Sequence, residues 1–137
     1  MRSDYWLQTR LERIWNVLMP EVKILNQVNI KFKGNWKTKF GHIKRLKDGS
    51  TEIIVNNLFR NEQVPEFIID TTIAHELIHY MHGFHSPLPK QFRYPHQGGI
   101  VDKELKNRGF SFLLKLEKDW IKNKWWTTYP LLKEEIS

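Results

Sequence analysis

The chain has 137 residues, a length that suits a single domain spanning 1–137. Hydrophobic residues make up 40% and aromatic residues 13%, which provides for one core and excludes a disordered chain. The net charge of +7 favours acidic partners such as DNA, although a solvated lysine-rich surface explains the same charge.

The lack of cysteine excludes disulfides, cysteine-ligated zinc and thiol nucleophiles. Charged residues interrupt the N-terminal segment, which therefore lacks the apolar core of a signal peptide. No stretch of the sequence reaches the roughly 20 apolar residues that cross a bilayer. We expect a cytoplasmic protein without membrane contact, and we take the monomer as its simplest state.

The first predicted element is an amphipathic helix over residues 3–19. Ser3 or Asp4 can cap its start, and Pro20 ends it. Its apolar residues recur at helical spacing: Leu7, Leu11, Ile14, Trp15 and Leu18.

Three strands are predicted next, over residues 28–33, 36–46 and 51–56. Residues 28–33 alternate apolar and polar side chains, as a half-buried strand does. Asp48 and Gly49 form a hairpin signal between the second and third strands. We expect these strands to form a small meander, antiparallel in the main.

A second helix is predicted over residues 65–82. Pro65 suits its first turn, and Gly83 is a natural stop. Residues 84–100 are rich in proline, glycine and histidine and predict a loop.

The last predicted element is a helical region over residues 101–126, with Gly109 as its point of interruption. Its expected buried side comprises Leu105, Phe112, Leu113, Leu116, Trp120 and Ile121. The predicted fold class is therefore α+β, with an N-terminal helix, a small antiparallel or mixed sheet, a central helix and a C-terminal helix.

The central helix carries the sequence motif that indicates chemistry, His75-Glu76-Leu77-Ile78-His79. Two histidines four residues apart leave the same face of a helix one turn apart, so both imidazoles can bind one zinc ion. Glu76 lies about 100° round the helix from His75, beside the histidine pair. It suits a general base that accepts a proton from water, as in metallopeptidases that carry the HExxH motif.

A catalytic zinc has three protein ligands and one open position, so a third ligand is needed. The downstream candidates are His82, His85, His96, Asp102 and Glu104. His82 is too far along a straight helix from His75, whereas a chain reversal at Gly83 can return His85. His96 stands between a proline and two glycines, which favours a constrained backbone that aims one side chain. Glu104 lies on the following helix, the arrangement that gluzincins use.

Residues 25–120 resemble the SprT-like zinc metallopeptidases, the family that includes the Spartan proteases. The resemblance begins with the strand at 28–33 and continues with Ile53-Ile54-Val55-Asn56, and it is strongest over Thr71–His79. Pro95-His96-Gln97-Gly98 is similar to the segment that carries the third histidine in that family, at a slightly greater distance from His79.

The resemblance implies a zincin-like fold, a Zn²⁺ cofactor and a protein or peptide substrate. By resemblance, His75, His79 and His96 bind the metal and Glu76 is the base. One departure concerns Arg108, which stands where the family places a histidine ahead of Gly-x-x-Phe. Either residues 97–108 are an insertion, or the third ligand has moved to Glu104. His85 is the remaining alternative.

Two further expectations concern substrate and partners. The zincin fold implies that the strand at 53–56 pairs with the substrate backbone as a sheet edge does. Tyr80, Tyr94 and His85 are available to steady an oxyanion, although each of them also suits a packing or surface role.

Trp120, Trp125 and Trp126 are interleaved with lysines, a pattern that suits base stacking, although a buried Trp120 beside a solvated lysine face explains it equally. Relatives in the family act on proteins crosslinked to DNA, which makes weak DNA binding a hypothesis to test. The alternative functions are a basic nucleic-acid-binding module with a structural or vestigial zinc site, and an interaction protein with a chance motif.

Overall fold

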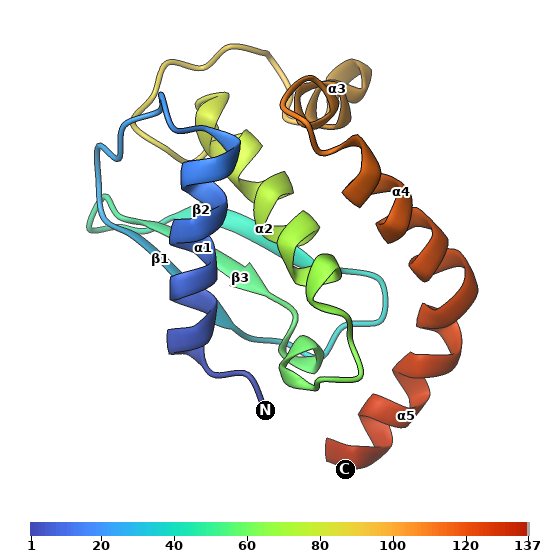
Figure 1. The fold of residues 1–137 in the computed structure, drawn as a ribbon. Coiled ribbons are helices and arrows are strands. Elements are labelled where there is room, and N and C mark those ends of the chain that lie inside the picture. The colour runs from blue at the N-terminus through green and yellow to red at the C-terminus, as the bar shows by residue number, and fades with distance from the viewer. Residues whose placement is uncertain (137) are drawn as a thin grey trace.

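The computed structural model describes residues 1–136 and has an α+β architecture, with helices layered on a three-stranded sheet (Figure 1). The elements are α1 (Asp4–Leu18), β1 (Val28–Phe32), β2 (Gly41–Arg45), β3 (Thr51–Val55), α2 (Glu66–Met81), α3 (Ile100–Asn107), α4 (Ser111–Trp120) and α5 (Trp126–Ile136). Short 3₁₀ turns cover Asn57–Arg60 and Gln97–Gly99, and a π-helical turn covers Ile121–Trp125. None of the helices in residues 1–136 combines the length and the hydrophobicity that a membrane span needs.

Helix α1 forms as its sequence predicts. The hydroxyl of Ser3 accepts a hydrogen bond from the N–H of Trp6 at 3.0 Å and caps the first turn. The helix ends at Leu18, and the N–H of Met19 closes the last turn on the carbonyl of Trp15. The predicted apolar stripe is buried, and it packs the helix onto β1 and α2.

The sheet has the strand order β1-β3-β2, with β1 parallel and β2 antiparallel to β3. The predicted hairpin of the second and third strands is confirmed, but β1 pairs with β3 and not with β2, so the sheet is mixed and is not a meander. Ile53, Ile54 and Val55 of β3 are all buried. A strand that is apolar on both faces is most stable in the centre, whereas the half-polar β1 and β2 take the edges.

Strand β2 begins five residues later than the sequence predicts, because residues 33–40 form a loop that a buried side chain holds in place. The side-chain amide of Asn56 donates to the carbonyls of Trp36 at 2.8 Å and Lys39 at 2.9 Å. The backbone N–H of Asn56 donates to the carbonyl of Phe40 at 2.8 Å. This loop therefore has a fixed position beside the start of β2.

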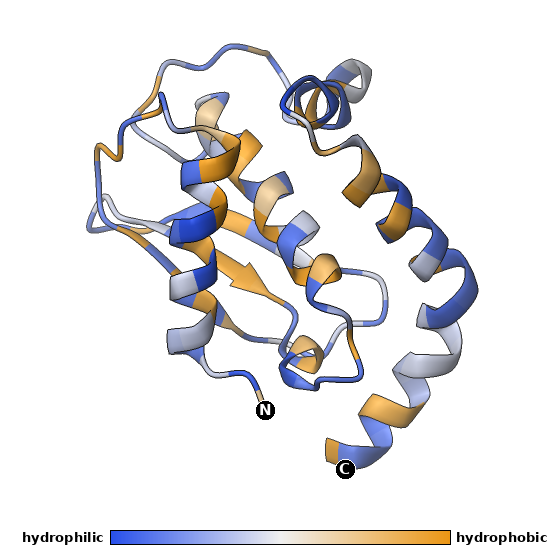
Figure 2. Cartoon of the chain, viewed as in Figure 1, coloured by the Kyte–Doolittle hydropathy of each residue, from blue (hydrophilic) through white to orange (hydrophobic). Residues whose placement is uncertain are grey.

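Helix α2 lies between α1 and α4 and packs on the sheet (Figure 1). It is buried on nearly every side, as expected of a helix that is apolar around most of its circumference. Figure 2 shows the apolar side of α1 and the apolar strands gathered around it. Gly83 ends the segment with a φ of +86°, and a Cβ at that position would lie only 2.3 Å from the carbonyl oxygen of Pro89. Only glycine fits this turn.

The C-terminal region breaks at Gly109, as predicted, but its buried side differs from the prediction. Phe112 is 69% exposed, and Trp120 is only partly buried. Leu105 is buried as predicted, but the other buried residues are Val101, Phe110, Leu114, Trp125 and Leu132. The direction of the chain changes at Gly109 and a π-helical turn follows, so one helical period does not run through the whole region.

Candidate metal centre

Three histidine side chains converge where α2 faces the loop that follows it. The Nε2 atoms of His75 and His79 are 3.1 Å apart, and each lies close to the Nε2 of His96, at 3.3 and 3.0 Å. Their nitrogen atoms could hold one metal ion. The structure thus brings together the three residues that the sequence selected from the motif and the resemblance.

The spacing of the three nitrogens is compatible with tetrahedral coordination. Ligand nitrogens at ~2.0–2.1 Å from a zinc ion in tetrahedral geometry are about 3.3 Å from one another. The observed triangle is close to this size, and a cavity of about 200 Å³ adjoins it, lined by the three histidines and Glu76. The donor set consists of imidazoles alone, which suits zinc and several other transition metals.

Burial keeps the two helical histidines neutral. It lowers the pKa of His75 to about 4 and that of His79 to about 3, and neighbouring histidines add to the effect. Neutral imidazole is the form that binds a metal, so no proton has to leave these rings at pH 7.

Glu76 lies beside the histidine triad and is 6% exposed. Burial raises the pKa of its carboxyl group to about 8. Within residues 1–136, no hydrogen bond satisfies this carboxyl group. Gly41, at the start of β2, lies beside this carboxyl group. A Cβ at Gly41 would lie 2.7 Å from the carbonyl oxygen of Ile54 and 2.8 Å from Thr72, and at an ordinary contact distance of 3.8 Å from the Glu76 carboxyl oxygen. A buried carboxyl group that lines the same cavity as the histidine triad suits a proton carrier.

A tight turn presents His96 to the other two histidines. The side-chain carbonyl of Gln97 accepts from the N–H of Tyr94 at 2.9 Å, which folds the chain around His96. Gly98 and Gly99 follow with φ values of +59° and +66°, a left-handed conformation that residues other than glycine rarely adopt. The expectation of a constrained backbone at this position is confirmed.

The two alternative third ligands lie outside the triad. The carboxylate of Glu104 is 3.3 Å from Nε2 of His82 and 3.0 Å from the guanidinium of Arg108, so it is engaged elsewhere. His85 is exposed beside the triad, with a φ of +59° and its carbonyl bonded to the hydroxyl of Thr51 at 2.7 Å. Neither residue belongs to the group that could hold a metal.

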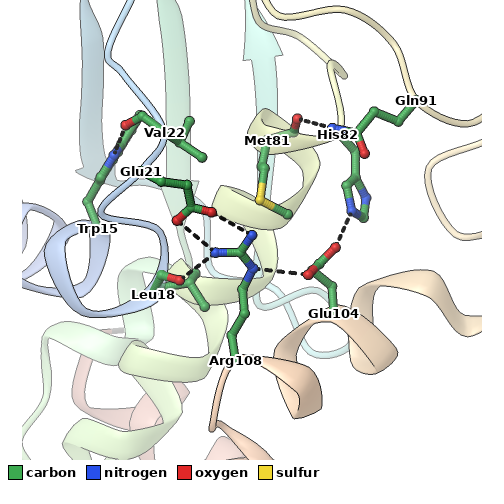
Figure 3. A network of polar contacts seen from close by, with 9 residues as sticks. All are labelled: Trp15, Leu18, Glu21, Val22, Met81, His82, Gln91, Glu104 and Arg108. Carbon is green, nitrogen blue, oxygen red and sulfur yellow. Dashed lines mark hydrogen bonds and ion pairs between the residues drawn. The ribbon is translucent and has the colours of Figure 1, made fainter.

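Arg108 has a role that the sequence did not indicate. Figure 3 shows its guanidinium between two carboxylates from distant segments. It lies 2.8 Å from Glu21, 3.0 Å from Glu104 and 2.9 Å from the carbonyl of Leu18. Because Glu104 also reaches the buried His82, this network ties α3 to the ends of both α1 and α2. We name it the Arg108 latch.

The same network continues into the loop that carries His96. The side-chain amide of Gln91 donates to the carbonyl of Met81 at 3.1 Å, and its N–H donates to the carbonyl of His82 at 2.9 Å. The middle of the segment between α2 and α3 is therefore tied back to the end of α2 (Figure 3).

In comparisons with protein-family models, curated proteins and solved structures, none matches this chain. The interpretation of the site therefore depends on its own geometry.

The strand at 53–56 is not a sheet edge, which corrects the expectation for substrate pairing. β3 has β1 on one side and β2 on the other. The edge nearest the triad belongs to β2, whose first residue, Gly41, packs against Glu76. The more apolar β3 occupies the centre of the sheet, and β2 occupies the edge.

The expectations for the aromatic residues also change. Tyr80 is fully buried, and its hydroxyl donates to Asn26 at 2.7 Å, so its role is structural. Trp125 is 1% exposed and therefore unavailable for base stacking, whereas Trp126 is 50% exposed. Trp120 is partly buried against the core, so of the three tryptophans only Trp126 presents much of its ring to solvent.

Proposed function

We propose that the protein is a zinc-dependent metallopeptidase of the SprT-like type, with a zincin-like fold, that hydrolyses peptide bonds. The observation that carries this proposal is the triangle of Nε2 atoms from His75, His79 and His96, with the buried Glu76 beside it. A purely structural metal site needs no unpartnered carboxyl group at its open side, whereas a hydrolytic site does.

The residues around the triad divide the chemistry between them. A bound zinc supplies a Lewis acid that polarises the substrate carbonyl and makes water a stronger nucleophile at neutral pH. Glu76 accepts a proton from the attacking water as the new C–O bond forms at the carbonyl carbon. It then donates that proton to the amide nitrogen as the C–N bond breaks, so that one carboxyl group serves both steps.

The free edge of β2 is the place where an extended substrate would lie. An added strand gains main-chain hydrogen bonds along an exposed sheet edge. The edge begins at Gly41, which lines the same cavity as Glu76 and the three histidines. A peptide paired there would carry its backbone past the triad.

The direct test is peptide cleavage by the zinc-loaded protein, followed with internally quenched fluorescent peptides. Activity should disappear after chelation and return when zinc is added back. Failure to cleave any peptide or unfolded protein, despite a full complement of zinc, would contradict the proposed function.

Proteins associated with DNA are the substrate class that the surface charge favours. The half-exposed Trp126 has Lys37 over its ring at 5.9 Å, and Lys122 and Lys124 are exposed on the preceding turn. Cations beside an exposed aromatic ring can hold phosphates and stack bases. The test is the binding of a fluorescent single-stranded oligonucleotide, which phosphate contacts should weaken as salt rises from about 50 to 200 mM.

A further inference from the structure

A second cavity, of about 530 Å³, adjoins the metal centre. It shares Gly41, His75 and Glu76 with the cavity of about 200 Å³ that contains the triad. The two spaces therefore meet at the residue we propose as the base. We name the larger cavity the side pocket. Its further walls come from the 37–40 loop and from the C-terminal segment, with Phe40, Ile121, Trp125 and Trp126.

One wall of the side pocket is aromatic and firmly held. Trp125 is 1% exposed, and its ring contacts those of Phe40 and Phe59 edge-on, at 5.2 and 5.8 Å between centroids. Its indole N–H donates to the carbonyl of Lys37 at 2.8 Å, so the one polar group of this side chain is already hydrogen-bonded. The same bond fixes the 37–40 loop. The pocket is therefore preformed, as ligand pockets usually are.

The π-helical turn at Ile121–Trp125 shapes one wall of the pocket. Such turns widen a helix locally and occur often at functional sites. Here the turn lies between α4 and α5, and both Ile121 and Trp125 line the cavity beside Trp126. An irregular element at this position is consistent with a wall built to receive a ligand.

Polar groups are present at the mouth and on one wall. Lys37 and Lys39 are exposed at the mouth and give it a positive charge. The carboxyl group of Glu117, on one wall, accepts a hydrogen bond from the hydroxyl of Thr71 at 2.6 Å. Burial raises the pKa of Glu117 above its usual range. The two lysines therefore disfavour a cationic side chain, and the aromatic walls favour an apolar one.

We propose that the side pocket binds a large apolar side chain of the substrate, aromatic or branched aliphatic, at the residue next to the scissile bond. This inference rests on the proposed peptidase function, and it assigns the substrate class of the same site. The pocket is large enough for any single side chain. Its contact with Glu76 places that side chain directly beside the reacting carbonyl.

The test uses fluorescent peptides that are identical except at the two positions flanking the scissile bond. At one of these positions, Phe, Tyr, Trp or Leu should give a kcat/KM about 10- to 100-fold above that of Ala, and Lys should be no better than Ala. The variant Ile121→Trp, which fills the pocket, should remove this preference and favour small residues. Phe112→Ala is the matched control, because Phe112 is exposed outside the pocket.

A binding measurement separates this inference from the proposed function. Zinc-loaded Glu76→Gln protein is titrated with a Phe peptide and the matched Ala peptide, and the indole N–H signals of the tryptophans are followed by NMR. The signal of Trp126, assigned with Trp126→Phe, should shift only with the Phe peptide.

Each outcome has a distinct meaning. Binding at Trp126 by the Phe peptide, without cleavage by the wild type, would leave the side pocket intact and overturn the peptidase function. Glu76-dependent cleavage with no apolar preference, or with a preference that Ile121→Trp leaves unchanged, would overturn the assignment of the side pocket.

Discussion

The metal centre is assembled from two regions that differ in how they are held. His75 and His79 lie on one buried helix, and their relative position follows from helical geometry alone. His96 is exposed on the loop between α2 and α3, and its position depends on contacts of Gln91 and Glu104 with the end of α2. The first region is therefore a local feature of the sequence, whereas the second is a product of the tertiary structure. The two should respond differently to mutation.

The largest effect is expected at the helical side of the site, from Glu76→Gln. Without the proton carrier, kcat should fall by about 10²- to 10⁴-fold, while zinc content stays unchanged. Glu66→Gln, in the first turn of the same helix, is the matched control and should keep near wild-type activity. Steady-state cleavage and elemental analysis of the same samples measure both quantities. Full activity in Glu76→Gln would exclude Glu76 as the base.

The next effect tests whether the loop supplies a true ligand. His96→Ala should weaken zinc binding by more than the roughly 10- to 100-fold that the loss of an outer partner costs. His85→Ala should weaken it far less, because His85 lies outside the triad. Competition with a chromophoric chelator measures both affinities. Equal losses in the two variants would contradict the assignment of His96 as the third ligand.

A smaller effect is expected at the Arg108 latch, which holds α3 behind the loop. Arg108→Met should lower the thermal midpoint and weaken zinc binding, because two carboxylates lose their shared partner. Arg108→Lys keeps the charge but not the planar fork, and it should recover only part of the loss. Thermal unfolding by circular dichroism, with and without zinc, separates stability from affinity. An unchanged zinc affinity in Arg108→Met would show that the latch does not position the loop.

The turn between the two regions provides a fourth test. Gly83→Ala should cost about 1–3 kcal/mol in free energy of unfolding, because φ is +86° and the new Cβ would meet the backbone of Pro89. Gly49→Ala also has a positive φ, of +87°, but nothing within 4 Å of the new Cβ. Comparison of the two variants therefore separates the backbone strain of a positive φ from the steric clash with Pro89. Equal losses in the two variants would mean that the contact with Pro89 contributes nothing.

The smallest effect concerns nucleic acid. Trp126→Ala should weaken oligonucleotide binding by about 1–3 kcal/mol per stacked base and leave zinc content unchanged. Phe112→Ala, another exposed aromatic position of the C-terminal region, is the control. Fluorescence anisotropy at two salt concentrations provides the measurement. Binding that is insensitive to both salt and Trp126→Ala would rule out this mode.

The contrast between the two regions also explains what the sequence could predict. The bounds of α1 and α2, the Ser3 cap and the break at Gly109 depend on local signals, and these predictions are confirmed. The pair His75 and His79 belongs to the same class, because helical spacing alone places both rings on one face.

Features that depend on distant contacts were predicted less well. The strand order was wrong because Asp48-Gly49 indicates a hairpin but does not reveal that β1 joins the far side of β3. His96 could be chosen over Glu104 through its flanking proline and glycines and through a family resemblance. The Arg108 latch and the side pocket left no local signal, because their residues come together from segments far apart in the chain.

The most direct test of the central claim is the zinc content of the purified, untagged protein, measured by elemental mass spectrometry alongside His96→Ala. We predict about one zinc per chain in the wild type and a large loss in the variant. Wild-type protein that contains no zinc, even after reconstitution, would contradict the metallopeptidase function and leave a basic interaction module as the better explanation.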